Sequence, residues 1–120
     1  MYKAVDFLHE ASIRLNRVVI EHLDFGQLIK TYDREESLFY LDPPYYEAEK
    51  YYPDRFQPED HTRLKTALNN IKGRFILSYN DSPEIRALYT GFKIIEAERM
   101  DNLAVMSHNR KYKELIIKNF

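Results

Sequence analysis

The stretch Leu38-Phe39-Tyr40-Leu41 runs directly into Asp42-Pro43-Pro44-Tyr45, and this junction decides how the chain folds. A short run of aliphatic and aromatic residues that is stopped by turn-forming residues is typical of a buried β-strand. Proline cannot donate to the ladder of a sheet, so the strand must end near Asp42. The residue before a proline is held extended, and each proline ring fixes its own φ angle. We therefore expect a buried strand over residues 38–41 that leads into a stiff loop.

The stiff loop presents three groups with little conformational freedom, namely the Asp42 carboxylate, the Pro43 carbonyl oxygen and the Tyr45 ring. Two acceptors beside an aromatic face suit a planar ligand that carries an amino group, such as adenine. Acceptors that bind both N6 hydrogens favour a localised N6 lone pair, which is the form that attacks an electrophile. Stacking on Tyr45 would contribute about 1–3 kcal/mol. The structural alternative is a proline turn in which Asp42 bonds to a nearby backbone group.

The residues around this junction resemble a known enzyme family. Residues 38–46, which read LFYLDPPYY, are similar to the catalytic motif of the Dam-like (D12 class) DNA adenine-N6 methyltransferases. The resemblance continues in the same order through residues 14–25, 56–61, 77–81 and 113–119, so it covers nearly the whole chain. It implies a DNA adenine-N6 methyltransferase that transfers a methyl group to an adenine rotated out of the duplex.

The resemblance also implies roles for individual residues. Asp42, Pro43, Pro44 and Tyr45 are the implied catalytic group, in which Asp42 and the Pro43 carbonyl accept the N6 hydrogens and Tyr45 stacks on the adenine. The implied methyl donor is S-adenosylmethionine, and its implied binding residues are Asp24, Phe25 and Asp42. The implied contacts to the target adenine are Tyr45, Tyr46 and Asn80.

Four of these residues also have simple structural interpretations. Asp24 is a good helix N-cap, with Phe25 in the core behind it. Asn80 begins an Asn-Asp-Ser-Pro sequence that is common in turns and helix caps. Tyr46 belongs to a tyrosine-rich loop that can pack on its own scaffold. Both kinds of role stay open for these residues.

One feature of the family has no counterpart in the sequence. Family members carry a Phe-x-Gly-x-Gly loop for the cofactor and then a target-recognition segment, both before the stretch seen here. The glycines Gly26, Gly73 and Gly91 lie too far apart to form such a loop. We therefore expect residues 1–120 to be the C-terminal part of a methyltransferase catalytic domain. The isolated chain is expected to be inactive, and a homodimer or a complementary N-terminal half is expected to cover its incomplete sheet.

Hydrophobic patterning predicts alternating helices and strands in the rest of the chain. Helices are expected at residues 5–15, 25–32, 58–72 and 83–89, and strands at residues 17–21, 38–41, 74–79, 92–98 and 112–118. This alternation predicts an α/β fold with a mostly parallel sheet covered by helices. The resemblance specifies a partial Rossmann-like SAM-dependent methyltransferase sheet that lacks its first two strands and has helices on both faces.

Composition and charge limit the class of protein. The formal net charge is −1, whereas a domain that binds DNA by itself is usually strongly basic, so most DNA contacts are expected elsewhere. There is no cysteine, and the four histidines lack metal-ligand spacing, so we expect no metal. Apolar runs are too short for a membrane span or a signal peptide. We expect a cytoplasmic protein encoded by a bacterium, an archaeon or a phage.

Other functions remain open from the sequence. The chain is alternatively a catalytically inactive remnant, a nucleic-acid-binding module, or the partner half of a split enzyme. A related class of enzymes methylates a protein glutamine amide, but that class usually has asparagine at the position of Asp42. Titration with S-adenosylmethionine separates these alternatives. No binding by the isolated chain favours the remnant or the split partner, and binding restored by a second polypeptide selects the split partner.

Overall fold

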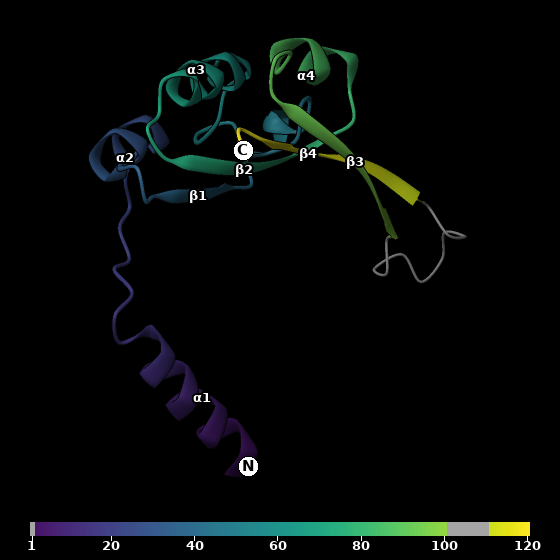
Figure 1. Ribbon diagram of the computed structural model, residues 1–120. Coiled ribbons are helices and arrows are strands. Elements are labelled where there is room, and N and C mark those ends of the chain that lie inside the picture. The colour runs from purple at the N-terminus through teal and green to yellow at the C-terminus, as the bar shows by residue number, and fades with distance from the viewer. Residues whose placement is uncertain (1, 101–110) are drawn as a thin grey trace.

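A four-stranded sheet with helices packed against it forms the body of the protein (Figure 1). The computed structural model describes residues 2–100 and 111–120. The helices are α1 (Tyr2–Leu15), α2 (Phe25–Tyr32), α3 (Pro58–Asn69), α4 (Pro83–Leu88) and the short 3₁₀ helix η1 (Glu49–Tyr51). The strands are β1 (Leu38–Leu41), β2 (Arg74–Asn80), β3 (Lys93–Met100) and β4 (Lys111–Lys118). The expected α/β fold class with a partial Rossmann-like sheet is confirmed.

The strand directions differ from the mostly parallel sheet that we expected. The strand order is β1-β2-β4-β3, in which β1 and β2 are parallel and β4 is antiparallel to both of its neighbours. Strand β4 lies between β2 and β3 and runs opposite to both, so two of the three strand pairs are antiparallel. The strand expected at residues 17–21 was wrong. Residue 17 lies in the turn that ends α1, residues 18–21 belong to no strand, and Val19 and Ile20 are 75% and 86% exposed.

The predicted strand over residues 38–41 is confirmed as β1, which lies at one edge of the sheet. It pairs in parallel with β2, from Leu38 opposite Arg74 to Leu41 opposite Leu77. Phe39 is buried, whereas Leu38 and Tyr40 point to the other face and are 60% and 71% exposed. Alternate side chains of a strand point to opposite faces, so only one side of β1 enters the core.

The hydrophobic core lies on one face of the sheet. Its strand residues are Phe39, Phe75, Leu77, Tyr79, Leu115 and Ile117, and its helix residues are Ile29 from α2, Leu64 and Leu68 from α3, and Ile85 from α4. In the described residues, the helices that pack on the sheet thus cover one face rather than the two faces that we expected. The opposite face, which we call the open face, carries the alternate residues of each strand.

A tight contact between two turns holds β1 and β2 in register. The Asp33 carboxylate accepts hydrogen bonds from the backbone N–H groups of Lys72 and Gly73, at 2.8 Å and 2.9 Å. A Cβ atom on Gly73 would lie 2.6 Å from the carbonyl oxygen of Ser37 and 2.8 Å from that of Arg34, so only glycine fits there. The register fixed by these turns sets where the loop after β1 meets β2.

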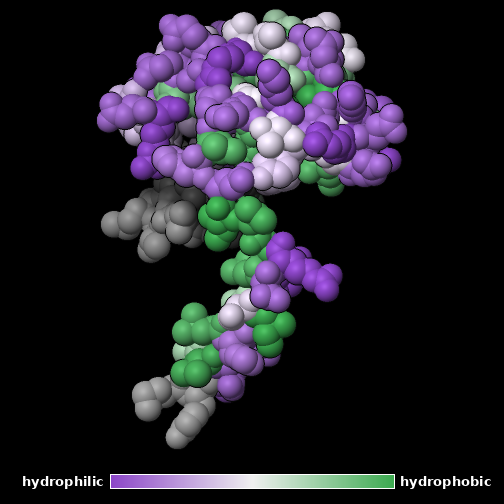
Figure 2. All heavy atoms as spheres, turned by 90° about the vertical axis from the view of Figure 1, so that its left-hand side faces the viewer, coloured by the Kyte–Doolittle hydropathy of each residue, from purple (hydrophilic) through white to green (hydrophobic). Residues whose placement is uncertain are grey.

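Helix α1 stands apart from this core. It extends away from the sheet in Figure 1, and the side chains of residues 3–15 are exposed. Figure 2 shows apolar side chains on α1 and on the extended segment that follows it. The exposed apolar residues in this part of the chain include Val5, Phe7, Leu8, Ile13 and Ile20. The predicted first helix is therefore confirmed, but it contributes nothing to the described core.

Candidate functional site

The loop after β1 begins beside the C-terminal half of β2. Ser78 lies on β2 directly after Leu77, the partner of Leu41. Its hydroxyl donates a hydrogen bond of 2.8 Å to Oδ1 of Asp42. The Asp42 side chain is exposed, so its orientation depends on this bond rather than on packing. The neighbouring strand thus fixes one oxygen of the carboxylate that the sequence singled out.

Two cavities meet at residues 42–44. The larger has a volume of about 500 Å³ and is lined by Asp42, Pro43, Pro44, Tyr45, Ala48 and Tyr52. The smaller has a volume of about 250 Å³ and is lined by Phe25, Tyr40, Leu41, Asp42, Pro43, Pro44, Phe56 and Leu64. The two rigid prolines and the carboxylate therefore form a shared boundary between a tyrosine-lined cavity and a phenylalanine-lined cavity.

The two tyrosines after the prolines have different surroundings. Tyr45 lines the larger cavity, and its hydroxyl donates a hydrogen bond to Oε1 of Glu114. Tyr46 is half-buried and packs against the core, with its ring 5.5 Å from the His61 ring. Its backbone N–H donates to Oδ1 of Asn80 at 2.8 Å, and Nδ2 of Asn80 donates to its carbonyl oxygen at 3.3 Å. Tyr46 and Asn80 hold each other, while Tyr45 faces the cavity.

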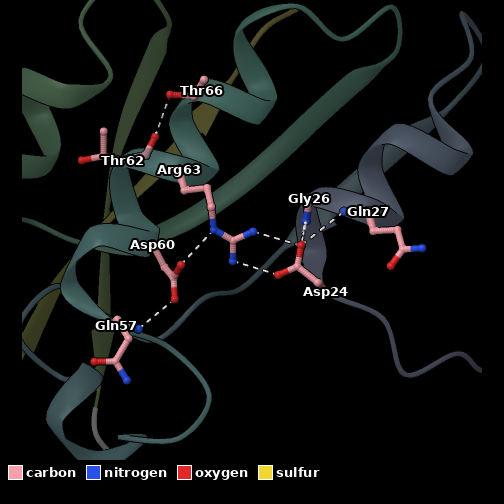
Figure 3. Close-up of polar contacts among 8 residues, drawn as sticks. All are labelled: Asp24, Gly26, Gln27, Gln57, Asp60, Thr62, Arg63 and Thr66. Carbon is pink, nitrogen blue, oxygen red and sulfur yellow. Dashed lines mark hydrogen bonds and ion pairs between the residues drawn. The ribbon is translucent and has the colours of Figure 1, made fainter.

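The predicted cofactor residues Asp24 and Phe25 lie at the start of α2. Figure 3 shows the polar contacts of Asp24. The Asp24 carboxylate accepts from the backbone of Gly26 and Gln27, which confirms its role as the N-cap. It also forms a bidentate ion pair with Arg63 of α3, in which Nη1 lies 2.9 Å from Oδ2 and Nη2 lies 2.8 Å from Oδ1. The hydrogen bonds from Arg63 hold the pKa of Asp24 below its usual value, although burial opposes this shift.

Arg63 joins this cap to the aromatic wall of the smaller cavity. Its guanidinium lies 3.9 Å from the centre of the Phe25 ring, within the range of a cation–π interaction. Its Nε also donates to Oδ1 of Asp60 at 2.9 Å (Figure 3). The Phe25 and Phe56 ring centres are 6.0 Å apart. Helices α2 and α3 are thereby tied together at the wall that Phe25 presents to the cavity.

A buried histidine links the loop after β1 to the core. The ring of His61, which is 2% exposed, bonds through Nδ1 to the Tyr79 hydroxyl at 2.6 Å and through Nε2 to Glu49 at 3.2 Å. Burial raises the pKa of Tyr79. Burial opposes ionisation of Glu49, but hydrogen bonds from its own backbone N–H and from His61 lower its pKa overall. These contacts anchor η1, and with it the wall of the larger cavity, to α3 and β2.

Several residues of the site were not predicted from the sequence. They are Ser78, Glu114 and Arg63, which bind predicted site residues, and His61, which anchors the loop. Ser78 and Glu114 lie within the segments that resemble the family, yet nothing in their spacing indicates which loop residue they contact. The sequence did contain one indication of the role of Ser78. Ser78 and the predicted site residue Asn80 are two residues apart on a strand and therefore share a face.

The described residues contain neither a candidate metal cluster nor a helix that could span a membrane. No group of three or more histidine, aspartate or glutamate side chains that could hold a metal ion is found within residues 2–100 and 111–120. In the same part of the chain, no helix has the length and apolar character needed to cross a membrane.

Comparison with known proteins identifies the family. A search of curated proteins found no match. The family model described as D12 class N6 adenine-specific DNA methyltransferase matches residues 2–103, which is most of the chain. The motif after β1 lies inside this region, as do the residues that line both cavities. The chain therefore belongs to the D12 class of N6 adenine-specific DNA methyltransferases.

Proposed function

We propose that this chain is the C-terminal part of the catalytic domain of an enzyme that transfers a methyl group from S-adenosylmethionine to N6 of an adenine rotated out of DNA. The family implies DNA as the substrate and a SAM-type methyl donor. The observation that carries the proposal is the pair of cavities that share Asp42, Pro43 and Pro44. A transfer between two bound molecules needs two sites with one common boundary, and two adjoining cavities support this assignment.

The larger cavity is the proposed adenine site. Tyr45 is the stacking platform, and the acceptors for the N6 hydrogens are the Pro43 carbonyl and the Asp42 oxygen that Ser78 does not bind. Binding both hydrogens favours a localised lone pair on N6. Rotating a base out of the duplex costs a few kcal/mol, and stacking worth about 1–3 kcal/mol offsets part of that cost. Tyr46 and Asn80 shape this site by holding the loop.

The smaller cavity is the proposed cofactor site. Its lining is mostly apolar, with Phe25 and Phe56 on one wall and Asp42 at its boundary, which suits the adenine ring of S-adenosylmethionine and its amino group. Asp24 borders this site by fixing the first turn of α2, which carries Phe25. When bound beside Phe25, Phe56 and Asp42, S-adenosylmethionine would supply an electrophilic methyl group. N6 would form a bond to the methyl carbon as the carbon–sulfur bond breaks, S-adenosylhomocysteine would leave, and N6 would release one proton to solvent.

Methyl transfer from tritiated S-adenosylmethionine to adenine-containing DNA tests this function. The chain is assayed alone and with a complementary N-terminal part of a D12 methyltransferase. We expect Asp42→Ala to abolish incorporation, because the carboxylate acceptor is lost. Asp54→Ala removes an exposed carboxylate from the same loop and serves as the matched control. Circular dichroism checks that both variants fold. Retained transfer by a folded Asp42→Ala variant would contradict the assignment.

A second candidate is the partner half of a split enzyme, which binds no cofactor by itself. The exposed apolar residues of α1 and of the segment after it favour this candidate, since such surface is usually covered by a partner. Isothermal titration with S-adenosylmethionine separates the two candidates. Binding by the chain alone supports a self-contained cofactor site, whereas binding only after addition of a second polypeptide supports the split enzyme. For both candidates we propose a cytoplasmic location, which a DNA substrate supports.

A further inference from the structure

We propose that Glu114 is a positioning residue that holds the Tyr45 ring in the orientation required to stack on the target base. This inference rests on the proposed function, because it assigns Glu114 a task in the adenine site. The starting observation is the hydrogen bond that the Tyr45 hydroxyl donates to Oε1 of Glu114. Glu114 lies on β4, 69 residues away in sequence from the tyrosine that it contacts.

Glu114 acts within a larger set of contacts on the open face of the sheet. It lies directly opposite Asn80 in the antiparallel pair of β2 and β4. Asn80 binds the backbone N–H and the carbonyl oxygen of Tyr46, and Glu114 binds the hydroxyl of Tyr45. This cross-strand pair therefore contacts two consecutive loop residues. Ser78, two residues earlier on β2, binds Asp42. We call Ser78, Asn80 and Glu114 the sheet-face brace.

The sheet-face brace restrains the side chain of Tyr45, which the prolines do not fix. Pro43 and Pro44 fix their own φ angles, but they do not fix the side-chain torsions of Tyr45. Tyr45 is only half-buried, so the core does not enclose its ring. A ring held at its backbone by the loop and at its hydroxyl by Glu114 loses little freedom when a base stacks on it. Preorganisation of this kind raises affinity by reducing the entropy that binding removes.

Deoxyadenosine is a suitable probe because it presents the target base without the rest of the DNA. The full chain is produced with ring-¹³C-labelled tyrosine, and the Tyr45 signals are assigned as those absent from Tyr45→Phe. We expect Glu114→Ala to shift these signals and to weaken deoxyadenosine binding about fivefold, the effect of losing one hydrogen bond. Glu114→Gln keeps an acceptor and should bind as the parent does. Glu84→Ala, an exposed carboxylate on α4 across the sheet, is the matched control.

A double-mutant cycle shows whether Glu114 works through the tyrosine hydroxyl. Tyr45→Phe combined with Glu114→Ala should bind no more weakly than either single variant, because both remove the same contact. Two results would overturn the proposal. One is a loss of binding free energy in the double variant that equals the sum of the two single losses. The other is unchanged deoxyadenosine binding by Glu114→Ala while Tyr45→Ala fails to bind. If the parent chain binds no deoxyadenosine, that result counts against the proposed function alone. The Tyr45 signals then decide: a shift in Glu114→Ala but not in Glu84→Ala supports positioning, and no shift refutes it.

Discussion

The sheet body (residues 24–100 and 111–120) and the N-terminal arm (residues 2–23) use apolar residues in opposite ways. In the sheet body, Leu77, Tyr79 and Tyr89 are 0% exposed. In the arm, Leu8 is 71% exposed and Ile20 is 86% exposed. Both regions carry apolar residues in regular patterns, yet only the body buries them. The spacing of apolar residues thus predicted α1 even though the helix buries none of those at residues 3–15, whereas burial requires a second surface.

The largest predicted effect is a difference between two matched leucine truncations. Leu77→Ala removes a fully buried side chain from the centre of the sheet, and we expect it to lower the free energy of unfolding by about 2–5 kcal/mol. Leu8→Ala in the arm should change the free energy of unfolding of the monomer, measured at a concentration too low for dimerisation, by less than about 0.5 kcal/mol. Urea unfolding followed by circular dichroism measures both. Equal effects would show that the arm packs on the body in solution.

The next effect concerns the buried histidine. His61→Phe leaves the Tyr79 hydroxyl without its partner, and we expect a loss of about 1–3 kcal/mol in unfolding free energy. Adding Tyr79→Phe removes the unpaired hydroxyl and should restore part of that loss. His9→Phe on exposed α1 is the control for the substitution itself. The same urea assay applies, and a double variant less stable than His61→Phe would contradict this account.

A smaller effect is expected at the N-cap of α2. Asp24→Ala should lower stability by about 1 kcal/mol, whereas Asp24→Asn keeps a capping oxygen and should lower it less. The pKa of Asp24 is lower in the folded protein than its ordinary value of 3.8, mainly because of Arg63. Its stabilising contribution is therefore present above pH 3.8 and is lost as the pH falls through the folded pKa.

Stability measured between neutral and acid pH checks this sign. The difference in unfolding free energy between the parent and Asp24→Asn should shrink as the pH falls below 3.8. A difference that grows on acidification would mean that the ion pair with Arg63 does not form in solution. Asp6→Asn in the arm is the matched control for loss of an exposed carboxylate.

Substitutions in the arm are expected to have the smallest effect on the stability of the monomer and a larger effect on its assembly. We predict that a second copy or a complementary half covers the apolar residues of the arm. Size-exclusion chromatography with light scattering should show a dimer for the chain alone, or a heterodimer when the other half is supplied. The double variant Phe7→Ser, Leu8→Ser should weaken either assembly without changing the unfolding midpoint of the monomer. A stable monomer under both conditions would contradict this prediction.

Much of the fold could be predicted because local signals agreed with tertiary packing. The segment from Phe25 to Tyr32 and the run from Leu38 to Leu41 form the helix and the strand that their patterns predicted. The strand expected at residues 17–21 failed, because β-branched residues favour a strand only when another strand pairs with them. The antiparallel order of β4 also escaped prediction, since alternating elements indicate parallel neighbours on average and do not specify where a late strand inserts.

The candidate site likewise contains residues that the sequence indicated and residues that only the structure revealed. Asp42, Pro43 and Tyr45 were identified from the sequence because their chemistry is contiguous and proline makes their backbone predictable. Ser78, Glu114 and Arg63 were missed because each contacts a loop residue more than 30 positions away. Contacts of that kind depend on strand register. Register in turn depends on long-range features such as the fit of Gly73 against Ser37.

The amino-acid sequence by itself determined the proline-containing loop after β1, its preceding strand, most of the helices and the family resemblance, because these depend on short-range stereochemistry and hydrophobic periodicity. Only the tertiary structure decided that the prolines separate two cavities, that one face of the sheet holds the core, and that the other face holds the sheet-face brace. The physical reason is that cavities and cross-strand contacts arise from the relative placement of distant segments, which follows from packing of the whole sheet.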